Sequence, residues 1–347
     1  MTSAAGLPWV QRVKETPVGE VPIVRTRLEL RDRLQNFLVR LGINRERYAV
    51  PPGLYGIGDP DADSPVLVTS NYKLTLDALR KELAAVTCWL LVLDTHGINV
   101  WCAAGKRTFS TTEIVGRLEA TRLEALVRHR TLVLPQLGAS GVAAHLVHKT
   151  TGFRVVYGPV RARDIPAFFH NKMKKDRDMR TVRFPLRDRL VLIPLELVLA
   201  LLVLVAGFLL VAAADWILHG ILDFGTAFRD FVPFLGAVLA GCVLVPVLLP
   251  LIPVRSFALK GLIVGILLAA LIEWAYSPSL VDGIATTVLI LSTSSLFALF
   301  FTGSTTFTSV SGVRREVRIA FPVLIPLLVA SILVGLISKL VALHHIS

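Results

Sequence analysis

Cysteine is scarce in this chain, and its few copies stand far apart. Only three occur among 347 residues, at Cys88, Cys102 and Cys242. A cage of four cysteines around a metal ion is therefore excluded for this chain alone, and no Cys-x-x-Cys pair supports a mixed cage with histidine. The same scarcity gives no disulfide framework, which agrees with a reducing compartment. A cysteine of this chain can therefore act as a single reactive thiolate or as a single axial ligand of a metal.

Charged side chains are scarce in the second half of the chain. The whole chain is 54% hydrophobic with a net charge of +12, and its mean hydropathy is +0.65. Most of the charge precedes residue 190, which predicts a soluble head followed by a membrane domain. Five apolar runs are each long enough to cross a hydrocarbon core of about 30 Å. They lie at about 190–212, 231–252, 257–275, 284–302 and 320–338.

The loops between these runs alternate in charge. Residues 172–189 carry eight Lys or Arg against three Asp, whereas residues 213–230 are mainly acidic. Basic side chains return before the third and fifth runs. This positive-inside pattern predicts a multi-pass protein of the inner (cytoplasmic) membrane, with the head in the cytoplasm and the C-terminus outside. No apolar core of signal-peptide length occurs in residues 1–19, which agrees with a cytoplasmic head.

The basic balance does not require a nucleic acid partner, because positive charge beside membrane spans usually reflects topology and lipid headgroups. Few charged residues fall within the spans. Glu196 and Lys260 lie near span ends. We therefore expect an anchor or docking platform in the bilayer, with a translocation pathway as the less favoured alternative.

The head predicts an α/β domain. We divide the chain into an N-terminal lead-in (1–59), an α/β domain (60–171), a basic linker (172–189) and a transmembrane domain (190–340). Strands are expected at 65–69, 88–94, 131–134 and 154–157, and helices at 74–85, 110–129, 141–150 and 163–170. Such alternation favours a largely parallel sheet with helices on both faces.

The run that contains Cys102 stands where α/β folds bind cofactors, because it follows the apolar strand at 89–93. Asn99 is a good helix N-cap, which would place Cys102 in the first turn of a short helix. There the helix dipole stabilises a thiolate, and Lys106 adds positive charge. Trp101 and the two alanines after Cys102 make this turn compact and apolar, suited to lying against a planar group.

Several alternatives compete for this run. A phosphate-binding loop is rejected, because Val100 and Arg107 occupy the positions of its glycine and its Ser/Thr. A catalytic cysteine–histidine pair is open but unsupported by spacing. Its candidate bases are His96, His129, His145 and His148. Cys102 could also be a small buried residue, which is how we interpret Cys88 in its strand and Cys242 in mid-span.

The run Asn99-Val100-Trp101-Cys102-Ala103-Ala104-Gly105-Lys106 resembles the cap-helix signature of the mercury-methylating corrinoid proteins. That family is related to the large subunit of the corrinoid iron-sulfur protein of the acetyl-CoA pathway. Three further stretches agree, at 69–75 (TSNYKLT), 134–138 (LPQLG) and 151–160 (TGFRVVYGPV). The resemblance covers residues 60–170, and the five-span tail also matches the methylating family.

The resemblance implies a Rossmann-like corrinoid-binding domain with a cap helix and a five-helix transmembrane domain. It implies a B12-type corrinoid with Cys102 as the lower axial ligand of cobalt. A thiolate is a soft, strong donor, and its charge would help a methyl group leave with its bonding electrons. The implied corrinoid contacts are Thr69, Asn71, Asn99, Val100, Trp101, Cys102, Ala103, Ala104, Gly105, Lys106, Gln136 and Gly138.

The implied reaction moves a methyl group from a methyltetrahydrofolate-type donor via methyl-cobalt to Hg(II), giving methylmercury. Cobalt must first be reduced to Co(I), yet the chain has no Cys-x-x-Cys and cannot hold an iron-sulfur cluster. The resemblance therefore implies a dicluster ferredoxin-like electron donor, which could also deliver Hg(II), and a separate methyl donor system. Two alternatives stay open: a corrinoid methyl carrier for another acceptor in one-carbon metabolism, or a membrane corrinoid-binding sensor or transporter.

One rival ligand lies nearby. Many corrinoid proteins use histidine in Asp-x-His-x-x-Gly, and this chain has Asp94-Thr95-His96-Gly97-Ile98-Asn99. The final glycine is missing. We therefore favour Cys102 as the cobalt ligand and expect His96 to shape the turn after the strand.

Overall fold

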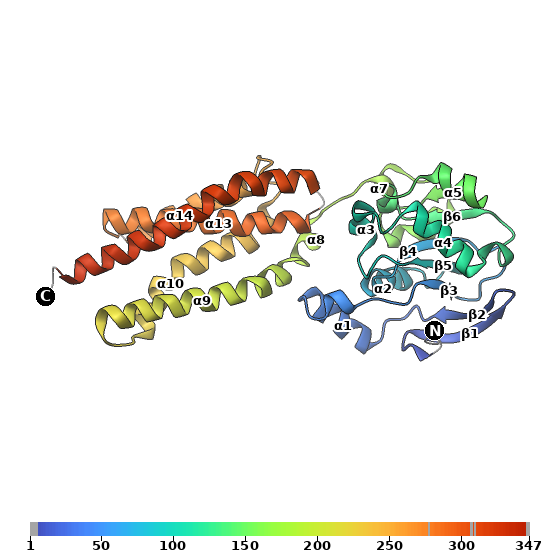
Figure 1. The fold of residues 1–347 in the computed structure, drawn as a ribbon, viewed down its shortest axis with the longest axis horizontal. Helices are drawn as coiled ribbons and strands as arrows, with labels where there is room; N and C mark the ends of the chain where they lie inside the picture. The colour runs from blue at the N-terminus through green and yellow to red at the C-terminus, as the bar shows by residue number, and fades with distance from the viewer. Residues whose placement is uncertain (1–5, 277, 306–307, 309, 345–347) are drawn as a thin grey trace. The chain divides into compact units, whose positions relative to one another are not determined.

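The structure is a computed structural model that describes residues 6–276, 278–305, 308 and 310–344. It divides into two compact units, with the boundary between Val182 and Arg183. The first unit holds all the strands of the described residues, and the second is helical (Figure 1). Each unit is described by itself.

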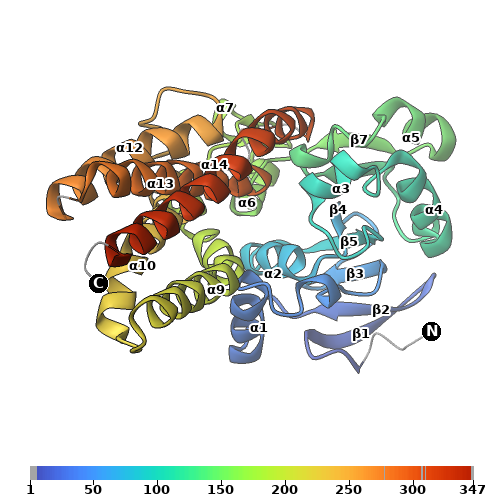
Figure 2. The same cartoon turned by 60° about the vertical axis from the view of Figure 1, so that its left-hand side comes forward.

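The first unit is built on one mixed sheet of seven strands in the order β1-β2-β3-β5-β4-β6-β7. Figure 2 shows β1 near one edge and β7 near the other. Strands β5, β4, β6 and β7 are parallel, whereas β3 pairs with β5 in the antiparallel sense. The strands are β1 (Val10–Thr16), β2 (Gly19–Val24), β3 (Gly53–Ile57), β4 (Val66–Ser70), β5 (Cys88–Leu93), β6 (Thr131–Leu134) and β7 (Arg154–Tyr157).

Helices cover both faces of the sheet. Successive side chains of a strand point to opposite faces. In β4, Val66 belongs to the core cluster that includes Ile114 of α4, while Leu67 belongs to the cluster that includes Leu76 of α2. The first face carries α3 (Val100–Lys106), α4 (Thr111–Thr121) and α5 (Ala144–Thr151). The second carries α2 (Lys73–Glu82) and α6 (Ile165–His170). The head also contains α1 (Leu30–Arg40), α7 (Arg177–Arg180) and the short 3₁₀ turns η2 (Arg45–Arg47), η3 (Leu123–Ala125), η4 (Gln136–Gly138) and η5 (Ala162–Asp164).

The head is larger than the α/β segment expected at 60–171. Strands β1, β2 and β3, in the expected lead-in, extend the same sheet and add its antiparallel part. Residues of the expected basic linker also fold onto the head, because Met179 is 6% exposed and its carbonyl accepts a hydrogen bond from Val160 N at 2.9 Å. The helix expected through residue 129 ends at Thr121, where Arg122 adopts a left-handed conformation with φ 48°.

The second unit contains five stretches of helix that are long and apolar enough to cross a membrane. They cover Leu186–His219, Phe224–Leu248, Phe257–Tyr276, Leu280–Gly303 and Ser311–Ala342. These are longer than or offset from the apolar runs of the sequence, because polar turns at their ends continue the helix. Their elements are α8 (Leu186–Leu190), α9 (Ile193–His219), α10 (Phe224–Leu239), the π-helical turn η6 (Ala240–Leu244), α11 (Val245–Leu248), α12 (Phe257–Tyr276), α13 (Leu280–Phe300), η7 (Phe301–Ser304) and α14 (Val310–His344).

Two lysines of this unit have partners within it. Lys339 of α14 contacts Asp215 of α9 at 2.8 Å and Asp230 of α10 at 2.5 Å. Lys260 donates to the carbonyls of Leu249 and Ile252, which follow α11. A buried charge in an apolar setting needs such partners. Lys339 therefore links α14 to α9 and α10. Lys260 links α12 to the segment that follows α11.

Candidate functional site

The parallel strands end together at one edge of the sheet, here called the carboxyl edge. From this edge β4 leads to α2 on one face, whereas β6 leads through η4 to α5 on the other. Connections that leave neighbouring strands in opposite directions open a crevice, which is where open α/β sheets bind ligands. The loops after β4, β5 and β6 carry most of the residues singled out from the sequence.

Asn71, directly after β4, organises the loop that follows β5. Its Oδ1 accepts hydrogen bonds from Thr95 N (3.0 Å), Thr95 Oγ1 (2.8 Å) and Gly97 N (3.0 Å). Its Nδ2 donates to Asp94 at 3.2 Å. Asn71 is 5% exposed. With its amide engaged in this way, Asn71 acts as a brace for the turn that precedes α3.

Helix α3 presents Cys102 on its outer side. Asn99 is the N-cap, and its side chain accepts a hydrogen bond from Cys102 N at 2.9 Å. Val100, Ala103 and Ala104 face the core, whereas Cys102 is partly exposed and Trp101 is 36% exposed. Gly105 and Lys106 are exposed on the same turn. The short helix expected after Asn99 is therefore present, with one apolar face buried and the thiol on the other.

The loop after β6 packs tightly against the segment that follows Cys102. A Cβ at Gly138 would lie 2.6 Å from the Phe109 ring, and one at Gly141 would lie 2.2 Å from the Phe109 carbonyl oxygen. The absence of side chains at these two glycines lets the loop reach α3 and its continuation. Gln136, in the same loop, accepts a hydrogen bond from Lys175. Gly138 therefore packs within the protein, and Gln136 already has a partner.

Tyr72 lies beside Cys102 and had not been singled out. Its side chain is buried, and burial raises the pKa of its phenol; the charges of Arg45 and Arg40 act against that rise, and a charged Cys102 adds to it. Two arginines and the thiol therefore lie in the charged surroundings of Tyr72.

Ser70 is a second residue that the sequence did not single out. It ends β4 on the face of Val66 and Val68, toward α3, whereas Thr69 faces the opposite side with Leu67. Ser70 is fully buried and its hydroxyl has no hydrogen-bond partner. Buried polar groups are rarely left unpaired. The parity of β4 would have identified Ser70, since alternation from Val66 places it on the α3 face.

The rival residues differ in environment. His96 is exposed in the turn after β5, with φ 56° and its N–H donating to Asp94 at 3.0 Å. His129 lies at the opposite edge of the sheet, where its Nε2 is 2.9 Å from the Ser64 carbonyl. His145 and His148 are exposed on α5.

The other two cysteines are buried. Burial raises the pKa of the Cys88 thiol to about 12, and Cys242 is 1% exposed. Across residues 6–276, 278–305, 308 and 310–344, no group of three His, Cys, Asp or Glu side chains could hold a metal ion.

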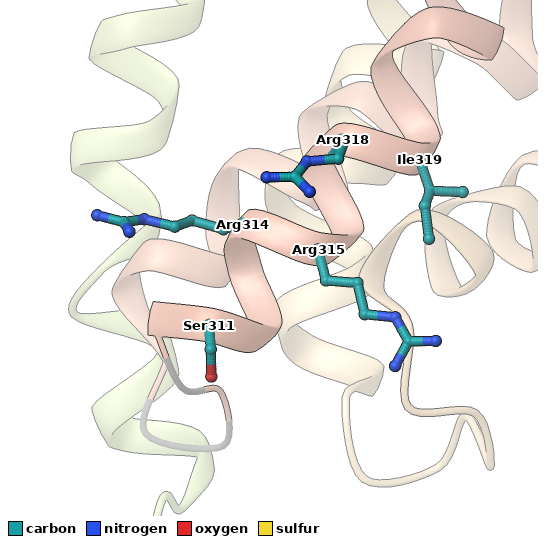
Figure 3. A pocket seen from close by; sticks show the side chains of 5 residues that line it. All are labelled: Ser311, Arg314, Arg315, Arg318 and Ile319. Atoms are coloured by element: carbon teal, nitrogen blue, oxygen red, sulfur yellow. The ribbon is translucent and has the colours of Figure 1, made fainter.

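Two hollows lie away from the carboxyl edge. One, of about 680 Å³, opens at the amino ends of β4, β5 and β6 and is lined by Val66, Thr87 and Thr131 among others. The other, of about 630 Å³, lies at the start of α14, where Figure 3 shows Arg314, Arg315 and Arg318 projecting from the helix. Neither contains a cysteine. The second has the charge that anionic headgroups favour.

Residues 43–169 match the family model described as CO dehydrogenase/acetyl-CoA synthase delta subunit. The chain is similar to the acetyl-CoA decarbonylase/synthase complex subunit gamma of Methanopyrus kandleri, at 38% identity over 130 residues, which are 37% of this chain and 28% of that protein. The subunit of the same name from Archaeoglobus fulgidus is 36% identical over 113 residues, 32% of this chain and 24% of that protein. The chain thus spans about a quarter of the length of these curated relatives. The matched segment holds every loop of the carboxyl edge.

Proposed function

We propose that the head binds a corrinoid at the carboxyl edge, with Cys102 as the lower axial ligand of cobalt. The observation that carries this proposal is the place of Cys102: a partly exposed thiol on the outer side of α3, directly after a central parallel strand. Support also comes from the resemblance of residues 99–106 to a corrinoid cap helix, and from the similarity of residues 43–169 to acetyl-CoA decarbonylase/synthase subunits.

The residues present fit a flat, amide-bearing macrocycle. The outer side of α3 offers Trp101 and Cys102, and a Cβ at Gly105 would meet nothing within 4 Å. The unpaired Ser70 hydroxyl supplies a hydrogen-bonding group at the same edge. A thiolate is the soft donor that cobalt of a corrinoid accepts.

The neighbouring residues hold this ligand in place. Asn99 fixes the first turn of α3 through Cys102 N, and Asn71 fixes the turn before it. Tyr72 interacts with Cys102 and also lies in the field of Arg40 and Arg45. Of the twelve contacts implied by the resemblance, we retain Trp101, Cys102 and Gly105 as direct contacts and treat Asn71, Asn99 and Gly138 as positioning residues. Val100, Ala103 and Ala104 hold α3 on the core, while Lys106 and Gln136 remain proposed contacts at the rim. Thr69 is buried on the other face of the sheet and is not retained as a direct contact.

When bound, the corrinoid supplies a cobalt centre that accepts and releases a methyl group. We propose that the protein moves a methyl group from a methyltetrahydrofolate-type donor to Hg(II), giving methylmercury. Cys102 would hold the cobalt through a soft, strong thiolate donor, and the bound group would supply methyl transfer to a soft electrophile such as Hg(II). Electrons would come from a dicluster ferredoxin-like partner, because the three separated cysteines offer no iron-sulfur site. The helical unit would hold the head at the cytoplasmic face of the inner membrane.

The similarity to subunits named for acetyl-CoA decarbonylase/synthase favours one second candidate, a methyl carrier for another acceptor in one-carbon metabolism. The two candidates share the cofactor and Cys102 and differ in what receives the methyl group. A corrinoid sensor or transporter would bind the cofactor without turnover.

The decisive experiment adds Hg(II), without oxygen, to the full chain loaded with methylcobalamin. Wild type, Cys102→Ala and the matched control Cys242→Ala are compared for methylmercury yield and for the corrinoid spectrum. We expect wild type and Cys242→Ala to give methylmercury and Cys102→Ala to give none, with an altered spectrum. A loaded wild type without product would favour another acceptor or a binding role, and unchanged output from Cys102→Ala would refute the axial assignment.

The same assay separates Cys102 from His96. Neutral imidazole donates less charge than thiolate, so Cys102→His should retain the corrinoid with weaker transfer. His96→Ala should leave both spectrum and yield close to wild type. Loss of the axial-ligand signature in His96→Ala, with Cys102→Ala unaffected, would reassign the ligand.

A further inference from the structure

Helix α1 faces the solvent with its apolar side. Leu30, Leu34 and Phe37 recur at i, i+4 and i+7, which places them on one face of the helix. They are 82%, 56% and 56% exposed. Ile43, just after the helix, is 47% exposed. This is the reverse of a globular surface helix, whose apolar side is turned toward the core.

The inward side of α1 is largely polar and holds the helix in this orientation. Asp32 contacts Lys73 at 3.2 Å and Arg80 at 2.7 Å, and all three side chains are buried. Asn36 accepts a hydrogen bond from Tyr48 at 2.9 Å. Rotating α1 to bury its leucines would expose this network and break its ion pairs. The outward direction of the apolar side is therefore specified by the fold.

Arginines flank the exposed apolar side. At about 100° per residue, Arg31 falls on one flank of the Leu30–Phe37 stripe, and Arg33 and Arg40 fall on the other. All three are exposed. The surrounding stretch, residues 25–47, has seven arginines against three acidic residues, and one of those three is the buried Asp32.

We propose that α1 lies in the surface of an anionic lipid bilayer, with Leu30, Leu34 and Phe37 at the acyl boundary and the flanking arginines at the phosphates. An apolar stripe bordered by exposed cations is the pattern of helices that bind in the plane of a membrane interface. Arginine stems can extend along apolar surface while their guanidinium groups reach the headgroups. The chain also carries five helices suited to span a membrane. A head on the same chain as such helices is tethered to a bilayer and meets that surface at high effective concentration.

Docking of α1 would bring the carboxyl edge to the lipid surface as well. The segment after α1 pairs with the loop after β4, since Lys73 N donates to Tyr48 O at 2.9 Å and Val50 N to Asn71 O at 2.8 Å. Arg40, at the end of α1, lies in the charged surroundings of Tyr72. The interface helix and the loops of the candidate site therefore form one connected piece of the head.

The test measures the depth of α1 in the full chain, reconstituted in nanodiscs of phosphatidylglycerol and phosphatidylcholine. A nitroxide is attached in Leu34→Cys and, as a control, in Glu119→Cys on exposed α4, both with Cys102→Ala so that the remaining cysteines are buried. Collisions with oxygen, which enriches in lipid, are compared with those of a nickel chelate, which stays in water.

We expect oxygen to dominate at residue 34 and the nickel chelate at residue 119. Replacing phosphatidylglycerol by phosphatidylcholine should shift residue 34 toward the chelate. Equal behaviour of the two sites in anionic discs would overturn the proposal, because α1 would then face water. Low collision rates for both reagents at residue 34 would also overturn it, by showing that protein covers this face.

Discussion

Single side chains at the carboxyl edge divide into those that shape the edge and those that face outward from it. Asn71 and Gly138 were singled out from the sequence as contacts for a ligand, and the structure uses them inside the protein. Cys102 and Trp101, on the other side of α3, keep exposed surface. A ligand bound at this edge would therefore meet few side chains, and the thiol would be prominent among them.

The three cysteines should differ sharply in reactivity. With iodoacetamide at about pH 8, native protein should gain one carbamidomethyl group, at Cys102, because thiolate character and access control alkylation. Burial raises the pKa of Cys88 to about 12, and Cys242 is also buried. Mass spectrometry of peptides gives the site. Labelling of Cys88 ahead of Cys102 would contradict the packing described, and denatured protein, modified at all three, serves as the reference.

The sequence reveals the residue types at the site better than their partners. The preference of asparagine for helix N-caps predicts the role of Asn99 from the sequence alone. In the structure its side chain accepts a hydrogen bond from Cys102 N, as an N-cap side chain does. The partners of the Asn71 side chain lie 23 to 26 residues away in the sequence, so no local rule could assign them. The alternation of β4 places Ser70 on the α3 face, but that its hydroxyl is unpaired depends on neighbours from other elements.

Among the elements, the junction between α3 and the loop after β6 is the tightest part of the site. In Gly141→Ala the new Cβ would lie 2.2 Å from Phe109 O and 3.0 Å from Ala104 Cα. We expect a loss of about 1–3 kcal/mol of stability and faster amide exchange in α3. Gly116→Ala, in the exposed middle of α4, meets nothing within 4 Å and should stabilise by about 0.5–1 kcal/mol.

Denaturant unfolding of the full chain in detergent, together with hydrogen exchange, measures both variants. A Gly141→Ala protein as stable as wild type, with α3 equally protected, would show that the loop can move away from α3.

The ion pairs under α1 should make the head sensitive to acid. Burial alone would raise the pKa of Asp32, but hydrogen bonds and charge from Arg80 and Lys73 outweigh it and hold the pKa below its usual value. A depressed folded-state pKa contributes stability above the unfolded value of about 4, and that contribution is lost as the pH falls through the folded pKa.

Asp32→Asn should therefore lower stability at neutral pH by about 2–4 kcal/mol. It should also reduce the further loss of stability as the pH falls. Asp63→Asn, which removes an exposed partner of Arg128, should change stability by less than about 1 kcal/mol. Urea midpoints followed by circular dichroism across pH 3 to 7 provide the measurement. Equal acid sensitivity in wild type and Asp32→Asn would assign the effect to other carboxylates.

Strongly apolar elements were predicted closely, and polar ones were not. Strands β6 and β7 have the expected bounds, 131–134 and 154–157. Strand β1 was missed because five of its seven residues are polar or charged and it lies at the sheet edge, where no core demands apolar alternation. The apolar residues of α1 recur at helical spacing, but periodicity cannot reveal that its apolar side faces outward.

For the molecule as a whole, the distribution of charge predicts how the helical unit crosses the membrane. Alkaline phosphatase fused after the last helix should be active in the periplasm, whereas a fusion after Val254, between α11 and α12, should be inactive. The physical basis is retention of Lys- and Arg-rich loops on the cytoplasmic side, here residues 172–189 and the Arg314–Arg318 segment. The reverse pattern of activity would contradict a cytoplasmic head.

The bond network of Lys339 also bears on the order in which the protein is made. Asp215 and Asp230 lie on the first two long helices, and their shared cation arrives 124 and 109 residues later, on the last. Until α14 is synthesised, two carboxylates stand in the bundle without that partner, and unpaired charge resists burial in lipid. Ribosomal synthesis therefore delivers the neutralising residue well after both carboxylates, so that the early helices can close fully only once α14 has been made.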